Sequence, residues 1–229
     1  MIEAFSEQFR KDMKNYSGKD EPEKTVKFFN RYFADKNAMT EDAASLCAKV
    51  NVHLTDRELK SMCRSMIRFA QYQDFQKNIG KKPAPVFSAV DVYNQPLSLE
   101  RFKGKYVLLH FWSMYSRPSV DELSDLKKIY KKYGKKGLVI ISINGDKLAG
   151  DLDKKTLLNF IKEMNLNWRH IADGNARNLF DIYFVHNYPT LYLLNREGYI
   201  VAREKDLRGE KLYTTIGRLN LSTKRSERQ

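Results

Sequence analysis

Two serines three positions apart stand where an apolar segment gives way to an amphipathic one, in the stretch HFWSMYSRPSVDEL of residues 110–123. Ser116 immediately precedes a predicted helix, so its hydroxyl is predicted to cap that helix by accepting a hydrogen bond from the backbone N–H of Ser119. A serine can also act as a nucleophile, but only with a base within hydrogen-bond reach. His110 is the nearest base in sequence, and its place on a predicted strand favours a buried, hydrogen-bonded core residue. The stretch therefore does not predict a serine hydrolase.

Thiols are scarce in this chain, because Cys47 and Cys63 are its two cysteines. They lie 16 positions apart in a segment predicted to be helical. Two thiols at this distance are too few and too widely spaced for a zinc cluster. We expect buried free thiols, because free cysteine packs as a small hydrophobic residue. A disulfide between the two cysteines is the alternative. No metal site and no cofactor are predicted.

Positive charge dominates the chain, with a formal net charge of +13 over 229 residues. Residues 1–78 hold 14 Lys and Arg against 12 Asp and Glu, a net +2, whereas residues 79–229 hold 27 against 16, a net +11. Such an excess can attract acidic partners, but net charge bears first on solubility, and we expect a soluble basic surface. The lysines of LKKIYKKYGKK, residues 126–136, surround the predicted C-terminal end of a helix, where positive charge interacts favourably with the helix dipole. We expect a solvated face there and no nucleic acid.

Signals for export and membrane insertion are absent from the sequence. No apolar run approaches the roughly 18 residues of a transmembrane helix, so no membrane span is predicted. The first residues, MIEAFSEQFRKDMKNY, are charged and amphipathic, unlike a secretory signal peptide. Either the protein stays in the cytosol, or this chain lacks an export segment that the gene encodes.

Three parts follow one another along the chain: a helical region at 1–78, a domain at 79–221 and a polar tail at 222–229. In the first part, PEKTVKFFNRYFADKN and TDRELKSMCRSMIRFAQYQDF repeat apolar residues at helical spacing. Thr55 and Glu58 open the second of these segments with a capping box. IGKKPAPVFSAVD, with its two prolines, then reads as a connector that ends in a strand.

Strand and helix patterns alternate beyond the connector. Strands are predicted at 86–92, 106–111 and 138–143, helices from 117 or 118 to 133, at about 154–164, at about 176–183 and at about 210–219, and a hairpin in PTLYLLNREGYIVARE. The continuous apolar runs at 107–111 and 138–143 are typical of central strands covered on both faces. This order predicts an α/β domain with a mixed central sheet and helices on both faces.

Several landmarks in this domain occur in a known order. KGKYVLLHFW is a strand that ends at the aromatic Trp112. After three intervening residues, Ser116 and Ser119 stand at a helix start, with Pro118 between them and Glu122 shortly after. Downstream lies YFVHNYPTLYLLNREGYIV. From about residue 79 to 219 the chain resembles the thioredoxin superfamily, and specifically its TlpA-type thiol–disulfide exchange branch. The resemblance implies a thioredoxin-like fold after an all-helical N-terminal segment.

The serines are where the chain departs from this family, whose members carry Cys-x-x-Cys at the positions of Ser116 and Ser119. In such enzymes a thiolate at a helix start attacks a disulfide, and the second thiol resolves the mixed disulfide. A hydroxyl forms no disulfide, so neither step is available to this chain as given. The resemblance therefore predicts the scaffold without its dithiol chemistry.

The resemblance also implies a loop with a cis proline, at Tyr188-Pro189-Thr190, next to the site helix. In the family this loop offers backbone groups to an extended peptide, a mode of binding that does not depend on sulfur. We therefore predict a retained binding groove. Its predicted residues are Trp112, Tyr115, Arg117, Pro118, Tyr188, Pro189 and Thr190.

Three hypotheses for function follow. The first is a redox-inactive module that binds a peptide, a protein partner or a small ligand. The second is a TlpA-type thiol–disulfide oxidoreductase of cell redox homeostasis, which requires that the serines replace natural cysteines or that Cys47 or Cys63 serves instead. The third is a basic adaptor for acidic partners. The family suggests the cell envelope if an export segment is missing and the cytoplasm if the chain is complete; the oligomeric state stays open.

Overall fold

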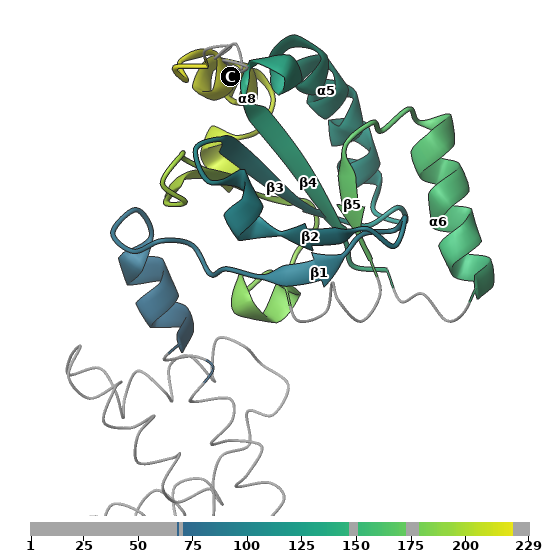
Figure 1. Cartoon of the computed structure of the whole chain (residues 1–229), viewed down its shortest axis with the longest axis horizontal. Helices are drawn as coiled ribbons and strands as arrows, with labels where there is room; N and C mark the ends of the chain where they lie inside the picture. The colour runs from purple at the N-terminus through teal and green to yellow at the C-terminus, as the bar shows by residue number, and fades with distance from the viewer. Residues whose placement is uncertain (1–67, 69–70, 147–150, 173–178, 222–229) are drawn as a thin grey trace, which may run out of the picture. The chain divides into compact units, whose positions relative to one another are not determined.

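A five-stranded mixed sheet forms the centre of the part of the chain that the structure describes. Its strands are β3 (Tyr106–Trp112), β4 (Leu138–Asn144), β5 (Arg169–Ile171), β6 (Thr190–Leu194) and β7 (Ile200–Arg203), in the spatial order β5-β4-β3-β6-β7. The pairs β3–β4 and β4–β5 are parallel (Figure 1). Strand β6 is antiparallel to both β3 and β7. The mixed sheet of the predicted fold is thus present.

The computed structural model describes residue 68 and residues 71–146, 151–172 and 179–221. The chain divides into two compact units, 1–75 and 76–229. Of the predicted N-terminal helices, residues 71–78 are described and helical. The rest of the helical region, with Cys47 and Cys63, and the tail at 222–229 lie outside the described residues. Among the described residues, no helix is long and apolar enough to cross a bilayer.

Strands β3 and β4 occupy the middle of the sheet because both of their faces are apolar. Every residue of β3 after Tyr106 is buried, and only Val139 of β4 keeps partial exposure. The two strands pair in register from Tyr106 opposite Leu138 to Trp112 opposite Asn144. Their carboxyl ends therefore lie side by side, and so do their amino ends.

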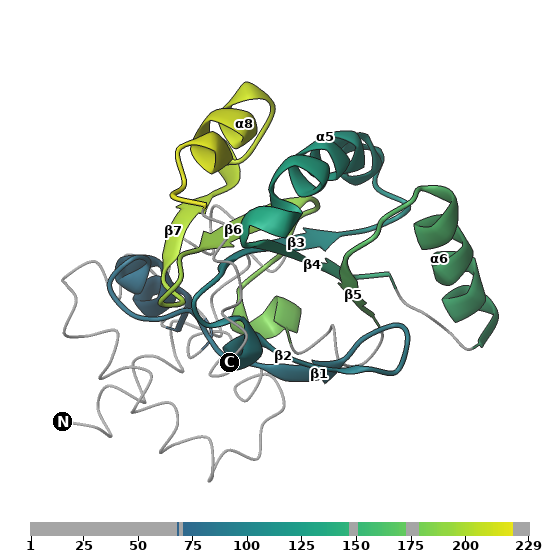
Figure 2. The same cartoon turned by 45° about the horizontal axis from the view of Figure 1, so that its top comes forward.

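Three helices cover one face of the sheet: α5 (Arg117–Tyr133), α6 (Asp151–Glu163) and α8 (Glu210–Gly217). Helix α5 buries a stripe at helical spacing, with Leu123, Leu126 and Ile129 in it. That stripe shares one apolar cluster with residues of α6 and α8, among them Leu157 and Leu212. Figure 2 shows α5 and α8 together above the sheet. Helix α5 begins and ends where the sequence predicts.

The opposite face is covered by a two-stranded hairpin and a helical turn. The hairpin consists of β1 (Ser88–Val90) and β2 (Pro96–Ser98), and the turn spans residues 179–182. Phe111 of β3 contacts the rings of Phe180 and Tyr183 at centroid distances of 5.1 and 5.5 Å. The Tyr183 hydroxyl donates to the Pro85 carbonyl at 2.6 Å, which fastens the connector to this layer.

Several elements differ from the prediction. The strand expected at 86–92 is the short β1, and the sequence does not predict β2 or β5. Single-turn 3₁₀ helices occur at η1 (Leu99–Phe102), η2 (Gly134–Lys136) and η3 (Glu204–Asp206). Two of them, η1 and η2, lie just before β3 and β4, so they line the amino ends of the central strands.

Candidate functional site

The candidate site forms where three elements meet at the carboxyl end of β3. Strand β3 ends at Trp112, a loop of residues 113–116 follows, and α5 begins at Arg117. Strand β6 begins at Thr190, which pairs in register with Phe111. This register places the loop that contains Pro189 beside the loop that precedes α5. The predicted site residues thus come together from segments about 75 positions apart in sequence.

Asp146 holds the loop before α5 in place. Its Oδ1 accepts a short hydrogen bond from the Ser113 hydroxyl, and its Oδ2 accepts from the Met114 backbone N–H at 2.9 Å. Asn144 at the end of β4 donates its side-chain amide to the same Oδ2 at 2.8 Å. The Ser113 hydroxyl in turn accepts from the Tyr115 N–H at 3.1 Å. A single carboxylate therefore ties the site loop to the neighbouring strand end.

Ser116 and Ser119 have different surroundings. Ser116 takes the backbone conformation of a helix cap, and its carbonyl accepts from the Val120 N–H at 3.1 Å. Its hydroxyl makes no capping hydrogen bond, so the predicted side-chain cap is wrong. This hydroxyl is partly exposed. Ser119 is fully buried, and its hydroxyl accepts a long hydrogen bond from the Ser113 N–H at 3.5 Å.

No base among the described residues activates either serine. His110 directs its Nδ1 to the Ser142 hydroxyl at 3.0 Å and its Nε2 towards Glu122, 3.6 Å from Oε2. Neither Ser116 nor Ser119 hydrogen-bonds a histidine or a carboxylate within the described part of the chain. The geometry agrees with the expectation that His110 is a buried, hydrogen-bonded core residue.

The loop before β6 carries a cis peptide bond between Tyr188 and Pro189. Arg208, which lies shortly before α8, donates from its guanidinium to the Pro189 carbonyl at 2.7 Å. The Thr190 hydroxyl donates to the Asn187 carbonyl at 2.9 Å. The loop is therefore fixed both from within and by a cation from a later segment.

Tyr188 rests on a glycine. A Cβ atom built on Gly145 would lie 2.7 Å from the Tyr188 Cζ and 2.8 Å from the Phe180 Cζ, closer than real Cβ atoms come to any neighbour. Tyr188 and Phe180 also meet edge to face, with ring centroids 5.5 Å apart. Glycine at 145 thus leaves the space in which Tyr188 packs. Burial raises the pKa of Tyr188, and the nearby Asp146 raises it further.

A row of buried polar side chains crosses the sheet beneath α5. His110, Ser142 and His170 are register neighbours on β3, β4 and β5. The Ser142 hydroxyl also accepts from the Trp168 indole N–H at 2.8 Å, and the His170 Nε2 donates to the Leu166 carbonyl at 3.1 Å. Burial lowers the pKa of His110 to about 3 and that of His170 to about 4, so both imidazoles are neutral at pH 7.

Glu122 is the acidic group of this row and lies on α5, above His110. Burial raises the pKa of Glu122 to about 7, Arg208 acts against this rise, and Asp125 adds to it. Its Oε2 has no hydrogen-bond partner among the described residues, and neither has the Nε2 of His110. Glu122 is therefore the member of this buried pair that titrates near neutral pH.

The predicted site residues differ widely in exposure. Tyr115 is 77 % exposed, Tyr188 is 38 % exposed, and the Arg117 side chain is 92 % exposed and 3.8 Å from Asp121. Trp112, predicted to line the groove, has no exposed surface, because it faces the helix-covered side of the sheet and packs against Phe160 at a centroid distance of 5.7 Å. It supports the site from below. Pro118 is exposed, whereas Pro189 and Thr190 are buried.

Sequence reasoning missed three residues that shape the site: Asp146, Gly145 and Arg208. The first two belong to the Asn-Gly-Asp triplet that begins at the last residue of β4, at the same sheet edge as the end of β3. Polar residues directly after a central strand were a usable signal for Asp146 and Gly145. Nothing in the local sequence distinguishes Arg208 from other surface cations. No group of three or more potential metal-ligating side chains occurs among the described residues.

A mixed sheet with this strand order, a helix that starts at the end of its central strand and a cis-proline loop beside that start define a thioredoxin-like protein. The AhpC/TSA family model matches residues 80–203, more than half of the chain, and the protein belongs to that family. Its relatives belong to the TlpA-like branch of the thioredoxin superfamily, as the sequence predicts.

Named relatives are thiol–disulfide oxidoreductases. The chain is 30% identical over 142 residues to the thiol-disulfide oxidoreductase ResA of Bacillus anthracis, a match that covers 60% of this chain and 78% of the relative. It is 31% identical over 118 residues to ResA of Bacillus subtilis (strain 168), covering 52% and 63%. These names favour the oxidoreductase hypothesis over the binding module.

Solved structures agree with the fold. The thioredoxin domain of a thiol-disulfide oxidoreductase from Bacteroides vulgatus matches with a TM-score of 0.52 and 30% identity, covering 61% of this chain and 95% of that one. A thiol:disulfide interchange protein from Bacteroides sp. matches with a TM-score of 0.54 and 28% identity, covering 64% and 93%. The thioredoxin-like fold is therefore confirmed for the domain beyond the connector.

Proposed function

We propose that this chain is a redox-inactive thioredoxin-like protein that binds an extended polypeptide beside the loop of Pro189. One observation carries the proposal: both dithiol positions hold hydroxyls, while the loops around them remain firmly held. Disulfide exchange needs a thiolate to attack and a second thiol to resolve. Ser116 and Ser119 supply neither, and serine has no accessible two-electron couple.

The loops around the serines are what a polypeptide partner would contact. Asp146 fixes the loop before α5, and Arg208 fixes the Pro189 carbonyl. Exposed aromatic rings, Tyr115 and Tyr188, stand on the two loops, and Arg117 adds a solvent-exposed cation. Aromatic side chains and arginine are the residue types that contribute most to polypeptide recognition. The binding surface does not require cysteine, because none of these side chains contains sulfur.

The test is a pair of measurements on the full chain. Insulin reduction with dithiothreitol should run no faster with the protein than without it. Isothermal titration with reduced and carbamidomethylated ribonuclease A, an unfolded polypeptide without thiols, should show binding. Tyr115→Ala should weaken that binding about tenfold, as for an aromatic anchor. Tyr93→Ala is the matched control, because Tyr93 is 55 % exposed at the turn between β1 and β2. No binding, or an equal loss in the control variant, contradicts the proposal.

The second candidate function is thiol–disulfide oxidoreductase, which the names of the relatives favour. Here it requires another thiol, Cys47 or Cys63, or natural cysteines in place of Ser116 and Ser119. Insulin reduction by the chain that disappears in a Cys47→Ser/Cys63→Ser variant would establish the first route. Determination of the natural gene sequence at codons 116 and 119 decides the second.

A further inference from the structure

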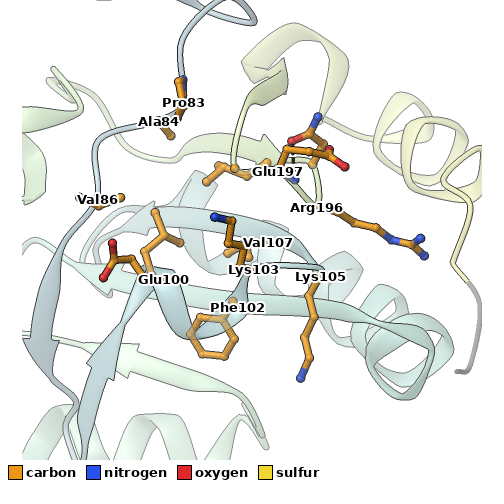
Figure 3. Close-up of a pocket in the computed structure, with 14 residues that line it drawn as sticks. Pro83, Ala84, Val86, Glu100, Phe102, Lys103, Lys105, Val107, Arg196 and Glu197 are labelled. Atoms are coloured by element: carbon orange, nitrogen blue, oxygen red, sulfur yellow. Dashed lines mark hydrogen bonds between the residues drawn. The ribbon is translucent and has the colours of Figure 1, made fainter. Parts of the chain in front are cut away.

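A cavity of about 210 Å³ lies at the other end of the central strands from the site. The connector, η1, the start of β3 and the β6–β7 turn surround it (Figure 3). Its walls are Pro83, Ala84, Val86, Leu99, Glu100, Phe102, Lys103, Lys105, Val107, Leu194, Asn195, Arg196, Glu197 and Gly198. None of these residues takes part in the site described above, so an occupant here would be independent of the proposed function.

Backbone hydrogen bonds build this cavity in advance of any ligand. The Ala84 N–H donates to the Gly198 carbonyl at 2.8 Å, which joins the connector to the β6–β7 turn. The Gly104 N–H donates to the Arg196 carbonyl at 2.8 Å, which joins the segment after η1 to the same turn. Inside the turn, the Asn195 side chain accepts from two backbone N–H groups. Walls fixed in this way need little ordering when a ligand binds.

The floor of the cavity is apolar and its volume is small. Ala84, Leu99, Val107 and Leu194 are each less than 9% exposed and form the bottom. Sites for drug-sized molecules usually measure about 300–1,000 Å³. The cavity is smaller than that and of a size to hold one apolar side chain. Val86, which is 62 % exposed, extends the apolar surface at the mouth.

Cations line this mouth, and we call Lys103, Lys105 and Arg196 the cationic rim. Lys103 and Lys105 lie just before β3, and Arg196 follows β6. In Figure 3 the ends of the Lys105 and Arg196 side chains point outward from the cavity. No described carboxylate forms an ion pair with Lys103 or Lys105. Their charge is available to a partner.

The chemistry of the walls distinguishes between classes of anionic partner. Glu100 and Glu197 also line the cavity, and their carboxylates would repel a continuous phosphate backbone. A flat bilayer surface would leave the concave apolar floor unfilled. A polypeptide can insert one side chain into the floor, place backbone N–H groups against Glu100 or Glu197, and direct its own carboxylates to the lysines.

We propose that this cavity is a docking site for an acidic polypeptide segment of a partner protein, which inserts one apolar side chain between Leu99 and Leu194 and pairs its flanking carboxylates with Lys103 and Lys105. The site lies at the opposite end of β3 from Ser116. One protein can therefore hold a partner at each end of the sheet.

Fluorescence anisotropy of the full chain with labelled five-residue peptides tests this. The peptide Glu-Glu-Phe-Glu-Glu should bind, Lys-Lys-Phe-Lys-Lys should not, and Glu-Glu-Ala-Glu-Glu should bind at least about tenfold more weakly because it leaves the floor empty. Lys103→Glu/Lys105→Glu should weaken binding of the first peptide at least about tenfold. The control Lys155→Glu/Lys162→Glu makes the same charge change on exposed positions of α6. It should alter affinity less than about threefold.

Three results would overturn the proposal. One is no binding of the acidic phenylalanine peptide at low salt. Another is equal weakening by the two lysine pairs, which would mean attraction by net charge alone. The third is binding to phosphatidylserine vesicles or to duplex DNA that Lys103→Glu/Lys105→Glu abolishes while no peptide binds. All four substituted lysines are exposed, and unchanged circular dichroism spectra will verify that the variants fold.

Discussion

The two ends of strand β3 differ in how their polar groups are used. At the carboxyl end, the donors of Ser113, Met114 and Asn144 all reach one carboxylate, that of Asp146. At the amino end, the lysines of the cationic rim have no described carboxylate as partner. Satisfied polar groups hold a loop in one geometry, whereas unsatisfied charges at a surface remain available to another molecule. The comparison separates polar groups that fix the shape of a site from charges that remain available to a partner.

The largest expected effect is on insulin reduction, when cysteines replace the two serines at the carboxyl end of β3. Ser116→Cys/Ser119→Cys places a thiol at the helix start and a second one a turn further on, where the backbone N–H groups favour a thiolate. We expect insulin reduction to rise at least about 100-fold above the level of the parent chain, because both steps of exchange become possible. The assay is run in a Cys47→Ser/Cys63→Ser background so that no other thiol contributes.

Ser116→Cys alone is the control for that experiment, since it can attack but cannot resolve. It should accumulate mixed disulfides without turning over. If the double variant folds, as judged by its near-ultraviolet circular dichroism, and still fails to reduce insulin, the site has lost more than its thiols. The contrast between the two ends would then need another explanation.

The next effect tests whether Asp146 is structural. Asp146→Ala removes the acceptor of three hydrogen bonds, which come from the Ser113 hydroxyl, the Met114 backbone N–H and the Asn144 side-chain amide. The substitution should lower the free energy of unfolding by about 3 kcal/mol. Urea denaturation followed by tryptophan fluorescence measures this, because both tryptophans, Trp112 and Trp168, lie in this domain. Asp121→Ala is the control: its carboxyl is 69% exposed, and its loss should cost less than about 0.5 kcal/mol. Equal losses in the two variants would contradict the structural role.

A smaller effect depends on pH. Burial raises the pKa of Glu122 to about 7 from its ordinary value of 4.5, so between these values the folded protein binds a proton that the unfolded chain has released. The stability that Glu122 contributes is therefore lost as pH rises through this window, by at most roughly 3 kcal/mol. Glu122→Gln should remove this dependence, which unfolding curves at pH 5 and pH 8 will measure.

Exposed Asp121 again provides the control, as Asp121→Asn, whose pH profile should follow that of the parent chain. His110 acts in the opposite sense at lower pH: its lowered pKa means that stability falls as pH drops below about 6.5, in the parent and in both variants. Superimposable profiles for Glu122→Gln and the parent would show that Glu122 does not titrate near neutrality.

Residues with periodic, local signals were predictable from the sequence, and those with long-range partners were not. The apolar stripe of α5 and the unbroken apolar runs of β3 and β4 gave their positions almost to the residue. Strand β5 has three residues, Arg169 and His170 among them, and forms only because β4 is beside it. Such a strand has no periodicity of its own.

The residues of the candidate site also divide into those with a local sequence signal and those with long-range partners. The positions of Ser116, Ser119 and Pro189 followed from a motif with fixed spacing. The failed prediction that Ser116 caps α5 with its hydroxyl shows the limit, because residue type fixes the backbone cap and not the direction of the side chain. Arg208 reaches the Pro189 carbonyl across 19 positions of chain, and only the folded arrangement brings the two together.

Gly145 offers no functional group, yet it decides which ring stands next to the Pro189 loop. A methyl group at 145 and a phenol at 188 exclude each other in space. In an alignment of related proteins these two columns should therefore covary, with bulk at one matched by a smaller side chain at the other. The residue at position 145 thus limits which side chains position 188 can carry on the surface beside the Pro189 loop.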